Sequence, residues 1–261
     1  MNKEFKQVEK VTLAAMLLAV SVILGSITKM ISIPHLSFIS ISFAPAIVVF
    51  ASLVLGPVYG AVVGGLSDLI PALIMPTGAY NFLLTIVFVL LGIFPWLLEK
   101  LTKKIRNFFP FTYVVIFLLL CVLGAETYFF YGTNILDQRL SYYSPYVKII
   151  ILCLSVLMDG ITIAGLILSD RYCKKKKEQF QNLPKPGEIA FISFFLVIGL
   201  LVFLKGLAYY LYFIVISSTG YRVSYEVIVS MLVIAAPLDI LLIDVIVPSL
   251  LLIFQKKNHT K

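Results

Sequence analysis

Long runs of apolar residues are the feature that most constrains this chain. A helix that crosses a bilayer needs about 20 predominantly apolar residues, and eight stretches of roughly this size recur along the 261 residues. They span residues 11–31, 39–55, 58–74, 81–98, 111–131, 147–168, 189–216 and 227–254. Only 13% of the residues are charged, against roughly 25% in a soluble domain. The expected fold class is therefore all-α, a polytopic membrane bundle of about eight transmembrane helices.

The distribution of basic residues predicts the orientation of this bundle. Sixteen of the 21 Lys and Arg residues lie in four clusters: at the N-terminus, after the fourth helix, after the sixth helix and at the C-terminus. An even number of predicted helices separates each cluster from the next, so all four clusters fall on one side. Since cytoplasmic loops carry the excess of Lys and Arg, both termini are predicted to be cytoplasmic.

The sequence lacks the residues that several kinds of enzyme chemistry require. The chain has two histidines and no HExxH motif, so zinc hydrolysis of that type is excluded. Its three cysteines, Cys121, Cys153 and Cys173, form no CxxC pair and predict neither a metal site nor a disulfide framework. No Walker loop is present, so the chain is not expected to hydrolyse ATP itself. We expect a protein that is not an enzyme, has no cofactor, and does not bind nucleic acid.

Small residues recur four apart at two places in the chain. Gly56, Gly60 and Gly64 follow one another at this spacing, and we interpret them as contacts within the bundle. Ala15 and Ala19 share one face of the first helix. Their spacing fits internal packing and partner docking equally well.

Ionisable residues inside predicted membrane helices are costly and usually face a cavity or one another. Asp68, Asp159 and Asp239 fall near the midplane, and Asp244 lies closer to the cytoplasm. They can form a ligand or ion pathway, or they can pair with lysines and hold the bundle together. Lys29 and Lys205, in the outer half, could bind an anionic solute.

An ordered set of motifs in the first half resembles a known family. Residues 43–82 read FAPAIVVFASLVLGPVYGAVVGGLSDLIPALIMPTGAYNF. The Gly-Pro turn at 56–57, the motif G-x-x-x-G-x-x-S-D from Gly60 to Asp68 in the third helix and the outer loop Pro76-Thr77-Gly78 resemble the substrate-binding S components of energy-coupling factor (ECF) vitamin transporters. The resemblance covers roughly residues 11 to 100, and the folate-type branch is the most similar through MPTGAYN.

The resemblance implies a function and a set of partners. Such proteins bind a vitamin-like small molecule near the outer surface of a prokaryotic plasma membrane. They dock through an alanine motif, here Ala15 and Ala19, onto a transmembrane coupling protein that carries two ATPase subunits. We predict a substrate pocket in which Tyr80 and Asn81 stack on or hydrogen-bond an aromatic ring system. The candidate substrate-binding residues are Lys29, His35, Asp68, Tyr80, Asn81 and Lys205.

The helix count departs from the family, whose members usually have two helices fewer. We therefore divide the chain into an S-component-like half at residues 1–108, an inserted helix pair with a basic cytoplasmic loop at 109–186, and a final helix pair with a basic tail at 187–261.

Two other functions stay open at this point. A proton- or sodium-coupled secondary transporter would use Asp68, Asp159 and Asp239 as coupling sites. A non-catalytic membrane assembly protein would show no ligand and would co-purify with envelope machinery.

Overall fold

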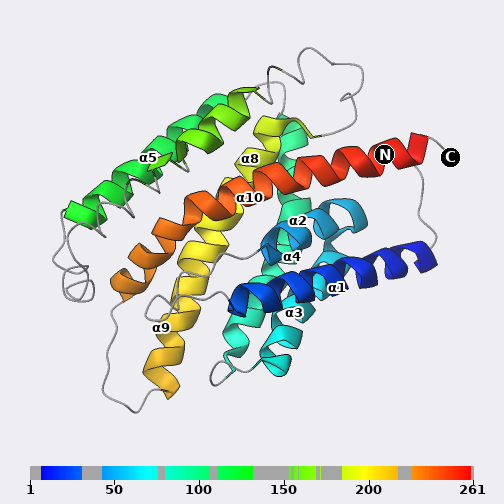
Figure 1. Ribbon diagram of the computed structural model, residues 1–261, viewed down its shortest axis with the longest axis horizontal. Helices are drawn as coiled ribbons and strands as arrows, with labels where there is room; N and C mark the ends of the chain where they lie inside the picture. Colours follow the sequence, from blue (N-terminus) through cyan, green and yellow to red (C-terminus); the bar gives the residue numbers. More distant parts are fainter. Residues whose placement is uncertain are drawn as a thin grey trace.

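The computed structural model describes residues 7–30, 43–75, 80–105, 111–131, 153, 156–157, 159–168, 171, 184–216 and 225–259. Throughout this part of the chain the regular structure is helical, without a β-strand (Figure 1). The all-α prediction is confirmed. Five helical segments are long and apolar enough to cross a membrane: Gln7–Ile27, Pro57–Ile74, Phe82–Ile105, Pro186–Tyr212 and Ala235–Phe254. Three shorter apolar helices, Ala44–Leu55, Phe111–Gly124 and Asp159–Leu168, fall within the other three predicted spans.

The first half contains four helices: α1 (Gln7–Met30), α2 (Ala44–Leu55), α3 (Pro57–Ile74) and α4 (Phe82–Ile105). Every residue of α2 is buried. Between α2 and α3, Gly56 adopts φ 95°, a conformation that side chains rarely tolerate, and Pro57 occupies the first position of α3, where its missing N–H costs nothing. This sharp reversal lays α3 directly against α2.

Glycines let α3 and α4 cross with their backbones in contact. A Cβ added to Gly60 would overlap the carbonyl oxygen of Gly92, and a Cβ added to Gly92 would overlap the carbonyl oxygen of Gly60. One turn further along α3, a Cβ on Gly64 would overlap the carbonyl oxygen of Phe88. Gly60 and Gly64 therefore serve packing within the bundle.

The described part of the second half begins with α5 (Phe111–Tyr131) and the short helix Asp159–Leu168. It continues through α8 (Pro186–Phe195), the nine-residue π-helix η1 (Leu196–Leu204) and α9 (Lys205–Ile216), and ends with α10 (Tyr225–His259). The seventh predicted span is thus a continuous helical rod whose middle third is π-helical, a feature that no composition pattern indicated.

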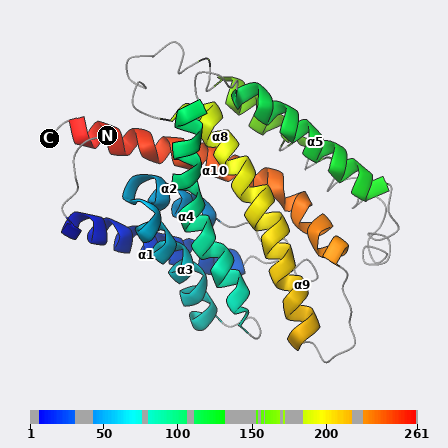
Figure 2. The same cartoon turned by 180° about the vertical axis from the view of Figure 1, so that it is seen from behind.

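The two halves pack together directly. Helix α10 contacts α2, while α4 contacts α8, η1 and α9. Helix α5 packs against α8 and α10 and lies at the edge of the bundle in both views (Figures 1 and 2). The end of α3, the start of α4 and the end of α9 lie toward the same side of the bundle (Figure 2). The core is apolar, with Val48, Leu91, Leu119 and Ile240 fully enclosed.

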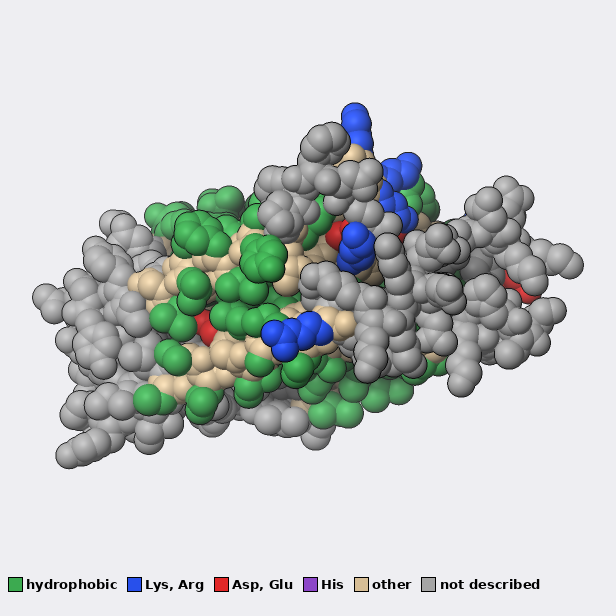
Figure 3. Space-filling view, turned by 90° about the horizontal axis from the view of Figure 1, so that it is seen from above, with side chains coloured by type: hydrophobic (Ala, Val, Ile, Leu, Met, Phe, Trp, Pro, Cys, Tyr) green, Lys and Arg blue, Asp and Glu red, His purple; other side chains and the backbone are tan. Residues whose placement is uncertain are grey.

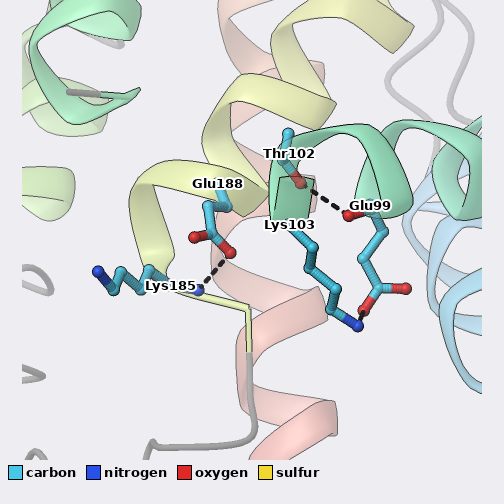
Figure 4. Close-up of polar contacts among 5 residues, drawn as sticks. All are labelled: Glu99, Thr102, Lys103, Lys185 and Glu188. Atoms are coloured by element: carbon cyan, nitrogen blue, oxygen red, sulfur yellow. Dashed lines mark hydrogen bonds and ion pairs between the residues drawn. The ribbon is translucent and has the colours of Figure 1, made fainter. Parts of the chain in front are cut away.

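Basic residues from two of the predicted clusters meet at the opposite end, where α4 finishes and α8 begins (Figure 4). Lys103 forms an ion pair of 2.6 Å with Glu99. Lys185 precedes α8, and its backbone N–H donates to the Glu188 carboxylate over 3.1 Å. This arrangement agrees with the predicted cytoplasmic side, while the absolute orientation in the membrane stays a prediction. Much of the described surface seen in Figure 3 consists of hydrophobic side chains, as expected for a lipid-facing bundle.

Candidate functional site

Asp68 and Tyr80 are linked through a residue that the sequence analysis did not single out. The hydroxyl of Thr85 on α4 donates to Oδ2 of Asp68 on α3 over 2.6 Å. The hydroxyls of Tyr80 and Thr85 are also hydrogen-bonded. Because Thr85 has one hydroxyl hydrogen and gives it to Asp68, Tyr80 is the donor in that second contact. The sequence does contain an indication of Thr85, because it is the only hydroxyl-bearing residue between 82 and 98.

Asn81 holds the start of α4 against α9. Its Oδ1 accepts a hydrogen bond from the backbone N–H of Leu83 over 3.1 Å, as an N-cap residue does. Its Nδ2 donates to the backbone carbonyl oxygen of Ala208 over 3.2 Å. The side chain is 8% exposed. Asn81 therefore has a structural role, but its amide keeps a second N–H and a further lone pair that a ligand could use.

Lys205 opens α9, three residues before Ala208 and so on the same side of that helix. Its positive charge acts on Asp239 of α10. The neighbouring Gly206 packs against Val229 of α10, with a hypothetical Cβ lying 3.1 Å from that side chain. Asp68 and Tyr80 are linked through Thr85, and Asn81 bonds to α9. Lys205 lies one turn from that bond and interacts electrostatically with Asp239 of α10. Four of the six predicted substrate-binding residues, Asp68, Tyr80, Asn81 and Lys205, thus belong to one series of neighbouring groups from α3 to α10. We call this series the polar array.

The other predicted residues lie apart from the polar array. Lys29 is in the last turn of α1, and its side chain lies outside the described part. His35 is also outside the described residues. Ala15 and Ala19 are exposed on α1, whereas Ala14 faces the core.

The exposed face of α1 is apolar. Beside the two alanines it carries Val11, 55% exposed, Met16, 63% exposed, and Ile23, 59% exposed. Within the described residues Ala15 and Ala19 are therefore not buried against another helix, and the docking interpretation of their spacing stays a prediction.

The midplane aspartates do not form one cluster. Asp159, in the helix Asp159–Leu168, is 1% exposed, and within the part of the chain that the structure describes neither of its carboxylate oxygens has a hydrogen-bond partner. Within the described residues there is no group of three or more His, Cys, Asp and Glu side chains that could hold a metal ion. Asp68 and Asp239 instead belong to the polar array.

Comparison with known families gives this geometry its context. Residues 9–169, more than half of the chain, match the sequence model of the family described as ECF transporter, substrate-specific component. The chain belongs to this family. It is accordingly a multi-pass membrane protein and a substrate-specific subunit of a transporter, which acts with the ECF module on a small-molecule substrate.

The family match confirms the resemblance inferred from residues 43–82 and extends beyond the range of roughly 11 to 100 on which that inference rested. Proteins of this family are in general not enzymes. The assignment to the folate-type branch stays a prediction. No curated protein and no solved structure matches the chain.

Proposed function

We propose that this ECF substrate-specific component captures a vitamin or a related nutrient at the outer surface of a prokaryotic plasma membrane and delivers it inward with two ATPase subunits. The observation that carries the proposal is the polar array. It brings together polar and charged side chains from four helices in a bundle whose core is largely apolar. Binding pockets combine apolar walls with a few placed polar groups in this way.

The polar array favours a ligand that has both a ring and charged or polar substituents. Tyr80 is 42% exposed and offers an aromatic face and a hydroxyl. Asn81 offers its remaining amide N–H, and Lys205 offers a positive charge to an anionic group. We place Lys29 and His35 in the same pocket, because both belong to the first outer loop or to the helix end that precedes it. A folate-like compound has this combination of a flat heterocycle and carboxylates.

We further propose that the exposed face of α1 is where the transmembrane coupling protein docks, with Ala15 and Ala19 at the contact. Small side chains allow two helices to approach closely in a membrane. The ATPases of the module supply the energy for transport, and this subunit has no catalysis of its own. The position of α5 at the edge of the bundle, against α8 and α10, supports the proposal that residues 109–186 are an insertion between the first half and the final helix pair.

The direct test is mass spectrometry of small molecules released from gently purified full-length protein. We expect one vitamin-like compound in stoichiometric amount. That compound is then used in binding assays with Lys205→Ala, and with Val62→Ala as a matched control on the exposed face of α3. We expect weaker binding for Lys205→Ala and unchanged binding for Val62→Ala. Equal affinities in both variants would show that the polar array is not the binding site.

A further inference from the structure

A second polar contact lies outside the polar array, where α8 packs against α10. Ser193 of α8 is fully buried, and its Oγ lies 2.5 Å from Oδ1 of Asp244 on α10. Ser193 precedes Lys205 by twelve residues along the same rod. In the predicted orientation the pair lies in the inner half of the membrane. Nothing in the proposed substrate site uses it.

The hydrogen count of this contact constrains its protonation state. The Ser193 hydroxyl carries one hydrogen, yet its Oγ has two oxygen neighbours within hydrogen-bonding distance. One is Oδ1 of Asp244, and the other is the carbonyl oxygen of Ala190 at 2.9 Å. If Asp244 is ionised, Ser193 satisfies one neighbour and the other contact has no hydrogen. Both contacts are hydrogen bonds when Asp244 carries a proton on Oδ1, because that O–H donates to Ser193 and Ser193 donates to Ala190.

The second carboxylate oxygen points to the same state. Oδ2 of Asp244 is enclosed and has no hydrogen-bond partner among the described residues. A buried ionised carboxylate needs a cation or several donors. No ion pair with Asp244 occurs among the residues that the structure describes. The cost of an enclosed oxygen without a partner is much smaller for a neutral acid than for a carboxylate.

The helices that pack against α10 offer few charged groups near this pair. Helices α2 and η1 carry no titratable residue. On α8, the Glu188 carboxylate accepts the backbone N–H of Lys185. On α9 and α10, Lys205 and Asp239 act on each other. Helix α5 meets α8 where Thr112 packs on Gly187, and its Glu126 is fourteen residues further on, about 21 Å along the helix.

We propose that Asp244 and Ser193 form a proton-binding site between α8 and α10. In this conformation Asp244 holds the proton on Oδ1 and donates it in a hydrogen bond to Ser193. A movement that separates α8 from α10 exposes the Asp244 carboxyl group to water. Because burial no longer disfavours its ionised form, the carboxyl group then releases its proton to solvent. A step of the transport cycle that opens this interface therefore depends on pH. The inference is independent of which solute the protein carries.

Infrared spectroscopy of the full-length protein in lipid nanodiscs tests the site. At neutral pH we expect a carboxylic-acid C=O band that Asp244→Asn lacks and that Ser193→Ala shifts in frequency. Asp68→Asn serves as the control and keeps this band. If Asp244→Asn does not fold, the shift in Ser193→Ala alone still reports on the site, because Ser193 is the acceptor for the acidic proton.

Three results would overturn the proposal. If Asp244→Asn instead loses a carboxylate band at neutral pH, or if neither variant changes the acid band, then Asp244 is ionised. If sodium stabilises the wild-type protein against heat, potassium does not, and Asp244→Asn abolishes the difference, the pair is a sodium site and not a proton site.

Discussion

The α3–α4 pair and the rod formed by α8, η1 and α9 build the polar array from opposite sides and in different ways. In α3 and α4 the backbones touch through Gly60 and Gly92, and the helices have little freedom to slide. In the rod, the nine-residue π-helix η1 lies between Ser193 and Lys205, and the rod packs into the bundle mainly through buried apolar side chains such as Val197 and Leu201. The π-helix is rare, and where it occurs inside an α-helix it is frequently found at a functional site. Asp68 therefore lies on a closely packed helix pair, which we call the rigid wall. We predict that the rod on which Lys205 lies is the more adjustable wall, because its middle is π-helical.

The largest expected effect comes from breaking the rigid wall. Gly92→Ala places a Cβ onto the carbonyl oxygen of Gly60, and because backbone must move, we expect destabilisation at or above the 1–3 kcal/mol typical of overpacking. Thermal unfolding in detergent measures it. Gly124→Ala on α5 is the matched control, since a Cβ there meets nothing within 4 Å. Equal melting temperatures for the two variants would contradict the close crossing.

The second-largest effect is expected at Asn81, whose side chain connects the two walls by its hydrogen bond to Ala208. Asn81→Ala removes the N-cap of α4 and the bond to Ala208, and we expect a loss of about 1–2 kcal/mol of stability. Asn81→Ser keeps a capping oxygen, loses the donor to α9 and adds no charge at this buried position. It should therefore be less destabilised than Asn81→Ala. If the two variants melt together, the bond across to α9 makes up the whole effect and the cap contributes nothing.

A smaller effect, confined to binding, is expected at Thr85. Thr85→Val keeps the shape of the side chain and removes the hydroxyl that joins Tyr80 to Asp68. We expect the affinity for the retained ligand to fall about tenfold, or about 1.4 kcal/mol, in line with one hydrogen bond to a charged group. Calorimetry of ligand binding provides the measurement. Thr12→Val, which removes an exposed hydroxyl bonded only to the Val8 carbonyl in α1, should bind normally.

The smallest effect probes the adjustable wall. Gly199 lies inside η1, and a Cβ there meets no atom within 4 Å. Gly199→Ala should therefore stabilise the protein by about 0.4–1 kcal/mol, because it reduces the freedom of the unfolded chain. If an adjustable η1 is needed for transport, the same variant should transport more slowly while it binds ligand as well as wild type does. A loss of stability would show that η1 depends on the glycine.

The sequence was sufficient for the helices and for part of the site, because apolar runs and glycine spacing are local signals. Every predicted span contains a described apolar helix. The predicted and observed helix boundaries differ where the composition changes gradually. Helix α4 was predicted to end at residue 98 and continues to Ile105. The helix can continue through this lysine-rich stretch because lysines at a helix end can extend their charged groups toward water.

The contacts that join helices left weaker traces in the sequence. Asn81 donates a hydrogen bond to the backbone carbonyl oxygen of Ala208 in α9. Every residue has such a carbonyl, so the side chain at position 208 gives no indication of this bond. In the sequence, Thr85 stands out only as a single hydroxyl residue in an apolar helix. The role of Ser193 depends on its contact with Asp244, 51 residues away, which the sequence does not indicate. The π-helix has no compositional signature, because it differs from an α-helix only in the spacing of its hydrogen bonds.

The most direct test of the central claim is uptake of the retained ligand into proteoliposomes. The protein is reconstituted with or without the coupling protein and its two ATPases. We predict uptake only when the complete ECF module and ATP are present, and no uptake when a proton or sodium gradient is imposed on the subunit alone. Uptake driven by either gradient without the ATPases would contradict the account and would identify the protein as an ion-coupled transporter.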